Sequence, residues 1–99
     1  MSARSKDFSN RVDRLLRHQG WIVEKQPHGS IVDIIASHQG GQKRAFKIKA
    51  HGHLTRAEIA ALHRYEKMHG IAVVYIHESE NEMVFSRMYK HLVRGRPEL

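Results

Sequence analysis

The chain contains no cysteine, so neither a disulfide framework nor a thiolate zinc site is available to it. It also lacks a long apolar run, and no stretch approaches the roughly 18 residues that a membrane-spanning helix needs. The N-terminal segment, MSARSKDFSN, lacks the apolar core of a signal peptide. From these absences we expect a soluble, intracellular (cytoplasmic) protein with no membrane partner.

Acidic residues are also scarce, since 10 Asp and Glu face 17 Lys and Arg, for a net charge of +7. A well-solvated basic protein is one reading of this balance, and a polyanion partner such as nucleic acid is the other. A basic membrane-surface helix is disfavoured because no basic helix here also has a broad apolar face. The clustering of the basic residues at the two ends of the chain favours nucleic acid: Arg4, Lys6, Arg11, Arg14 and Arg17, then Lys90, Arg94 and Arg96.

The length of 99 residues suits one domain, 1–99, with a basic N-terminal segment and a basic C-terminal tail. Periodicity and turn residues predict helices and strands in the order α-β-β-β-α-β-β, which is a single α/β domain with a mixed sheet flanked by helices. The predicted segments are a helix at 7–19, strands at 21–25, 31–37 and 44–50, a helix at about 55–69, strands at 71–77 and 83–86, and one helical turn after 86.

The ends of both helices have sequence signals. Ser5 or Asp7 is the expected cap of the first helix, and Gly20 is expected to end it. Thr55 and Glu58 form a T-x-x-E capping box for the second. The 71–77 strand, IAVVYIH, is almost continuously apolar, which is typical of a strand covered on both faces. This strand and the neighbouring helix offer more apolar surface than one core of this size needs, and we therefore expect a homodimer.

Charged residues interrupt two apolar strands around a Gly-Gly turn, in the stretch IVDIIASHQGGQKRAFKIKA (31–50). Asp33 falls inside the first strand, and burying a carboxylate without a partner is unfavourable. Lys47 and Lys49 are two residues apart in the second strand, so they share one face. Asp33 could be an ion-pair partner of either lysine. Alternatively, the carboxylate could hold a divalent metal while a lysine steadies developing negative charge on a phosphate.

With these residues in place, the sequence resembles the PD-(D/E)xK nuclease superfamily, and within it the archaeal-type Holliday junction resolvases. The resemblance runs from about Phe8 to His77. Its motifs are G-W-I-V after the first helix, Gly29-Ser30 ahead of V-D-I-I-A, a strand ending in x-I-K, L-T-x-x-E opening a helix, and G-I-A-V-V-Y-I. It implies a restriction-endonuclease-like core, Mg²⁺ or Mn²⁺ held by Asp33, Lys49 as the catalytic lysine, and cleavage of branched or duplex DNA by a symmetric dimer.

Two acidic positions of that family pattern are missing. Lys47 stands at the glutamate position two residues before the lysine, and Ser9 and Asn10 stand near the glutamate of the first helix. An ammonium in place of a metal ligand costs roughly 4 kcal/mol for two charges 4 Å apart in a protein-like dielectric. Three explanations stay open: a carboxylate from the next helix, Glu58 or Glu66, replaces the missing one; the site is inactive and Lys47 contacts phosphate in a DNA-binding pseudo-nuclease; or Lys47 is an engineered change in an otherwise active protein.

The DNA-binding residues that we expect lie in three places: the helix stripe Arg11, Arg14 and Arg17; the loop residues Ser30, His51 and His53; and the C-terminal Lys90 and Arg94. His51 and His53 are closely spaced, but two histidines alone make a poor zinc site. Phosphate contact or plain solvation fits them better.

Overall fold

The computed structural model describes residues 3–88 and confirms the expected order of elements. The elements are α1 (Ala3–His18), β1 (Ile22–Lys25), β2 (Ile34–Ser37), β3 (Lys43–Lys49), α2 (Arg56–His69), β4 (Ala72–Ser79) and β5 (Glu82–Arg87).

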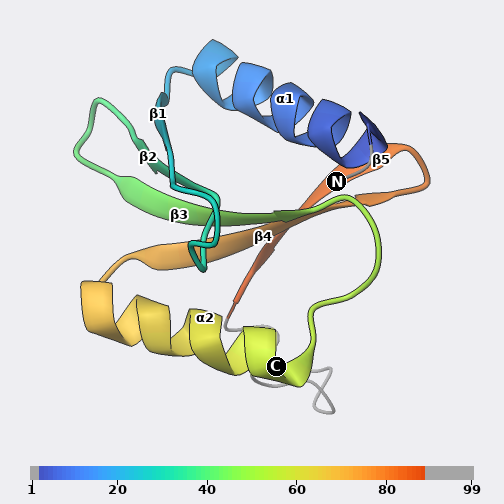
Figure 1. Ribbon diagram of the computed structural model, residues 1–99. Coiled ribbons are helices and arrows are strands. Elements are labelled where there is room, and N and C mark those ends of the chain that lie inside the picture. The colour runs from blue at the N-terminus through green and yellow to red at the C-terminus, as the bar shows by residue number, and fades with distance from the viewer. Residues whose placement is uncertain (1–2, 89–99) are drawn as a thin grey trace, which may run out of the picture.

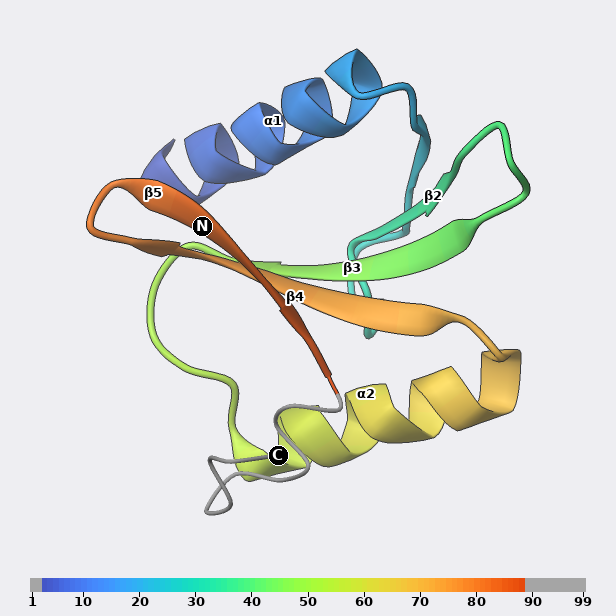
Figure 2. The same ribbon diagram turned by 180° about the vertical axis from the view of Figure 1, so that it is seen from behind.

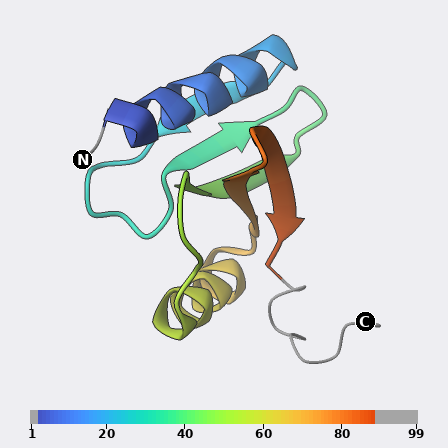
Figure 3. The ribbon, with the colours of Figure 1, turned by 90° about the vertical axis from the view of Figure 1, so that its right-hand side faces the viewer.

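The five strands form one mixed sheet in the order β1-β2-β3-β4-β5. Strands β3 and β4 are parallel, with α2 as the crossover between them, and the other neighbouring pairs are antiparallel. Helix α1 lies along one face of the sheet and α2 along the other, as Figures 1, 2 and 3 show. The predicted single α/β domain with a helix-flanked mixed sheet is therefore confirmed.

Two apolar layers hold the helices on the sheet. On the α1 side, Phe8, Val12 and Leu16 project at helical spacing onto the sheet and are at most 2% exposed. On the α2 side, Leu62 packs in a separate cluster of buried residues. Strand β4 contributes to both layers because its side chains alternate, and 73–76 is buried throughout.

The burial of β4 corrects one expectation. Its apolar side chains are buried within the chain itself, so this strand offers no surplus surface for a dimer. The large apolar side chains that are exposed lie apart in the sequence, at Ile22, Ile31, Met68 and Phe85. The argument for a dimer from β4 is wrong for this reason.

The ends of α2 are as expected, whereas the start of α1 is not. Thr55 and Glu58 form the reciprocal capping box, and Gly70, with φ of 64°, ends α2 in the left-handed conformation. Helix α1 begins at Ala3, so the prediction of a cap at Ser5 or Asp7 is wrong. The helix continues upstream because 3–7 contains no proline or glycine to stop it.

A turn joins β4 and β5 as predicted, but it is shorter than the expected 78–82, because Ser79 ends β4 and Glu82 begins β5. Glu80 and Asn81 both have positive φ, the backbone conformation of the tight turns that match the twist of a hairpin. Strand β5 includes the predicted 83–86 and extends to Arg87, and most of the segment in which a last helical turn was expected, 89–99, lies outside the described residues. Neither helix of the described chain is long and apolar enough to cross a membrane.

Candidate nucleic-acid interface

Asp33 lies just before β2 rather than inside it, which corrects the predicted strand at 31–37. Its backbone N–H donates to the carbonyl of Phe46 at 2.8 Å, as a strand residue would. Its carboxylate Oδ2, however, accepts the backbone N–H of Ile48 at 2.7 Å. The side chain thus takes the place of a backbone partner, because β2 pairing stops at Ile34.

Lys47 and Lys49 share the α2 side of the sheet, as their spacing predicted. Phe46 and Ile48 belong to the apolar layer on the α1 side, and alternation sends the two lysines the other way. The register places Asp33 next to Lys47, since Ile34 pairs with Phe46. Within residues 3–88, nevertheless, no lysine or arginine nitrogen forms an ion pair with the Asp33 carboxylate. The ion-pair interpretation of Asp33 is wrong for this part of the chain.

Lys49 is joined to the N-terminus of α2. Its Nζ donates to Glu58 Oε1 at 2.9 Å and to the carbonyl of His53 at 3.0 Å. The same Glu58 oxygen accepts the backbone N–H of Thr55 at 2.8 Å. The hydrogen bond from Thr55, together with the neighbouring Lys49 ammonium, lowers the pKa of the Glu58 carboxyl, although partial burial opposes this shift. One oxygen of Glu58 therefore accepts from two donors, both of which favour the charged form of the carboxyl.

Glu66, the other carboxylate considered as a replacement ligand, has a structural partner. Its Oε2 accepts the backbone N–H of Val73, at the start of β4. Glu66 also lies near the C-terminal end of α2, where its carbonyl accepts the N–H of Gly70, whereas Glu58 lies in the first turn. Of the two glutamates, only Glu58 contacts Lys49.

A pocket of about 210 Å³ lies between β3, α2 and the loop before β2. Lys47 and Glu58 are its charged lining residues, and Ile31, Ala57, Ala61 and Leu62 supply apolar walls. The pocket thus places a cation and an anion close to the end of β3, where Lys49 also lies.

The residues here do not fit a divalent metal of the implied type. Among residues 3–88, no group of three or more His, Asp or Glu side chains is arranged to hold a metal ion. Asp33 has one carboxylate oxygen bonded to the backbone, and Glu58 is paired with Lys49. Lys47 adds a positive charge where a second carboxylate would be needed.

Tyr75 and His77 also belong to this side of the sheet, and the sequence analysis did not single them out for function. Their rings stack with centroids 4.8 Å apart, and they pair in register with Lys47 and Lys49. The Tyr75 hydroxyl donates to the carbonyl of Gly52 at 3.4 Å. Burial, and to a smaller extent the charge of Glu58, raises the pKa of Tyr75. The spacing of two residues on β4 is the sequence signal that could have identified them.

The other expected DNA-binding residues lie in several places. His51 and His53 are exposed in the loop that the hydrogen bonds of Lys49 and Tyr75 hold in place. Ser30 ends a turn, because its N–H donates to the carbonyl of Pro27. Helix α1, which carries the arginine stripe with Ser9 and Asn10, lies on the opposite face of the sheet from α2 (Figure 3), whereas Lys47 and Lys49 belong to the α2 side. Lys90 and Arg94 lie outside the described residues.

Two of the α1 arginines are held by carboxylates. Arg11 reaches Glu78 of β4 at 3.4 Å, and Arg17 donates to Asp13 at 2.7 Å. Arg14 is exposed. The stripe is therefore less positive than its sequence suggests.

No protein-family model matches the chain, and no curated protein matches it in sequence. Among solved structures, the fold is similar to that of Hjc, a Holliday junction resolvase from the archaeal hyperthermophile Archaeoglobus fulgidus. The TM-score is 0.74 and the identity 14%, over 88% of this chain and 75% of that chain. At this identity the likeness shows the fold, a resolvase-like nuclease fold.

Proposed function

We propose that this chain binds branched or duplex DNA through the α2 side of its sheet, with Lys47 and Lys49 contacting phosphate. The observation that carries the proposal is that Lys47 stands where the family pattern has a second carboxylate, so that two lysines lie beside a single carboxylate, Asp33, which is bonded to Ile48. The net charge of +7 and the likeness to a resolvase support the same partner.

Phosphate binding follows from the chemistry of the two side chains. Each ammonium offers three donors at the end of a flexible stem, and Lys47 lines the pocket of about 210 Å³ between β3 and α2. Asp33 fixes the backbone that carries them. Lys49 is already paired with Glu58, so it must leave this carboxylate or contact the phosphate in addition to it. Lys47 is therefore the first lysine to contact phosphate, and Lys49 is the second.

A second candidate is metal-dependent hydrolysis of DNA, favoured by the place of Glu58 beside the lysine that matches the family pattern. Bound Mg²⁺ or Mn²⁺ would polarise the phosphate and activate water. Asp33 and Glu58 would be its carboxylates, and each would first have to give up the hydrogen bonds described above.

Two measurements separate these candidates: binding and strand cleavage. Each is made with a four-way junction and with a linear duplex, in a chelator, in Mg²⁺ and in Mn²⁺. We expect equal binding in all three buffers and no strand cleavage. Cleavage that disappears in Asp33→Ala and in Glu58→Gln would instead establish the enzyme.

We also propose a homodimer, because a four-way junction has two-fold symmetry that a symmetric dimer can match. Sedimentation at micromolar concentration should give twice the chain mass of 11.5 kDa. A mass of one chain, with and without junction DNA, would exclude it.

A further inference from the structure

A second pocket lies on the other side of the sheet, beside the C-terminal end of α1. Its volume is about 250 Å³, below the roughly 300–1,000 Å³ typical of sites for drug-sized molecules. The floor is formed by Phe46 and Val74, which pair in register on β3 and β4. These residues alternate with Lys47 and Tyr75, so this pocket and the lysine pair open on opposite sides of the sheet.

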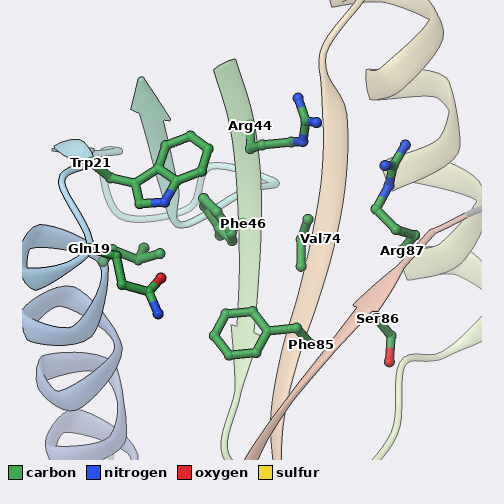
Figure 4. A pocket seen from close by; sticks show the side chains of 9 residues that line it. Gln19, Trp21, Arg44, Phe46, Val74, Phe85, Ser86 and Arg87 are labelled. Atoms are coloured by element: carbon green, nitrogen blue, oxygen red, sulfur yellow. The ribbon is translucent and has the colours of Figure 1, made fainter. Parts of the chain in front are cut away.

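Aromatic side chains form two walls of this pocket, as Figure 4 shows. Phe85 of β5 is 44% exposed, which is unusual for so large an apolar side chain. Trp21 is partly buried, and its ring meets Phe46 and His38 edge-on, with centroids 6.2 and 5.0 Å away. Trp21 is thus held in a fixed orientation with part of its surface toward solvent.

Two arginines line the same pocket, one on each side of β4. Arg44 belongs to β3. Arg87 belongs to β5, where it pairs in register with Val74 of β4. Figure 4 shows both guanidinium groups at one end of the pocket, away from the Phe85 ring. Flat apolar walls and two cations at one end complement a ligand with a planar ring system and an attached anion.

We propose that this pocket receives one unpaired nucleotide of DNA, its base against Trp21 and Phe85 and its phosphate against Arg44 and Arg87. The inference rests on the proposed DNA binding and adds a single-stranded contact to it. Aromatic stacking with arginine contacts to the backbone is the way proteins bind single strands, and it tolerates any base. An acidic peptide with an aromatic side chain is disfavoured, because the net charge of +7 and basic residues outside this pocket favour a long polyanion such as DNA.

Trp21 supplies the assay, because it is the only tryptophan in the chain. Addition of a short oligothymidine to the full chain, in chelator and at low salt, should quench its fluorescence and reach saturation. Phe85→Ala should weaken this binding about tenfold, since one base stacked on an aromatic ring contributes strongly to affinity. Phe85→Tyr should restore it, and Arg44→Gln with Arg87→Gln should weaken it and flatten its salt dependence.

Matched controls are Met68→Ala and Arg64→Gln, which remove an exposed apolar side chain and an exposed charge from α2. Both should leave oligothymidine binding unchanged, and all variants should keep the wild-type melting curve and affinity for linear duplex. No quenching by the single strand, or equal quenching in Phe85→Ala and wild type, would overturn the inference. Saturable quenching by an acidic aromatic peptide, with none by oligothymidine, would identify a protein-docking site instead. If oligothymidine binds but duplex and junction do not, the proposed function fails while the pocket stands.

Discussion

The carboxylate of Asp33 accepts the backbone N–H of Ile48 at 2.7 Å, between the two lysines of β3. This bond completes the pairing of β3 where β2 ends, so the one acidic residue that matches the nuclease pattern also has a structural role. If Asp33 also bound a metal ion, its single carboxylate would have to hold the metal and accept the N–H of Ile48.

Asp33→Ala should destabilise the fold. The substitution leaves the N–H of Ile48 without its partner in a partly buried place, which costs about 1–3 kcal/mol. Urea unfolding should show this loss, with a smaller one in Asp33→Asn, whose amide oxygen still accepts. DNA affinity in chelator should be unchanged or higher, because a negative charge near phosphate has gone. An unaltered unfolding midpoint in Asp33→Ala would contradict the structural role.

The ionised Glu58 should make the stability of the fold depend on pH in the acidic range. The pKa of Glu58 is lowered in the folded chain from its ordinary value of 4.5, chiefly by the N–H of Thr55 and then by Lys49. A group whose pKa is lowered on folding stabilises the fold above its unfolded pKa, and this contribution is lost as the pH falls below 4.5. Glu58→Gln should therefore be less stable at pH 7 and lose less on acidification, as thermal melts from pH 7 to 3 would show. Parallel curves for the two proteins would count against the paired state of Glu58.

Lys47→Glu should create divalent-cation binding. The new carboxylate lies beside Asp33 in the sheet register, and two carboxylates are near the minimum for Mg²⁺, which keeps several waters. Calorimetry should show Mn²⁺ affinity at least about tenfold above that of the natural chain, because a cation-repelling charge is replaced by an attracting one. Arg44→Glu, on the other side of the same strand, is the control and should show no gain. Strong Mn²⁺ binding by the natural chain, lost in Glu58→Gln, would favour a replacement carboxylate.

The α1 stripe should contribute to DNA affinity mainly through Arg14. Each neutralised phosphate adds about 0.9 to the log–log slope of affinity against salt, so Arg11, Arg14 and Arg17 changed together to Ala can flatten it by up to about three units. Because Glu78 and Asp13 hold Arg11 and Arg17, Arg14→Ala alone should produce the largest single effect. A slope that does not change in the triple variant would exclude this face from the interface.

The sequence predicted the elements well because their signals are local. Alternation placed Lys47 and Lys49 on one side, and Thr55 with Glu58 marked the start of α2. The start of β2 was missed because the Asp33 side chain replaces a backbone partner, which no periodicity reveals. The pairing of Lys49 with Glu58 and the pocket between Phe85 and Trp21 depend on how the strands lie side by side, so they required the structure.

The most direct test of DNA binding through the α2 side of the sheet is the salt dependence of duplex and junction affinity in chelator. Wild type should be compared with Lys47→Gln/Lys49→Gln and with the control Arg64→Gln/Lys67→Gln, which removes two exposed charges of α2. We expect tight binding without divalent metal, and a slope flatter by about two units in the lysine pair but not in the control. Binding that requires Mg²⁺ or Mn²⁺, or equal slopes in both double variants, would contradict it.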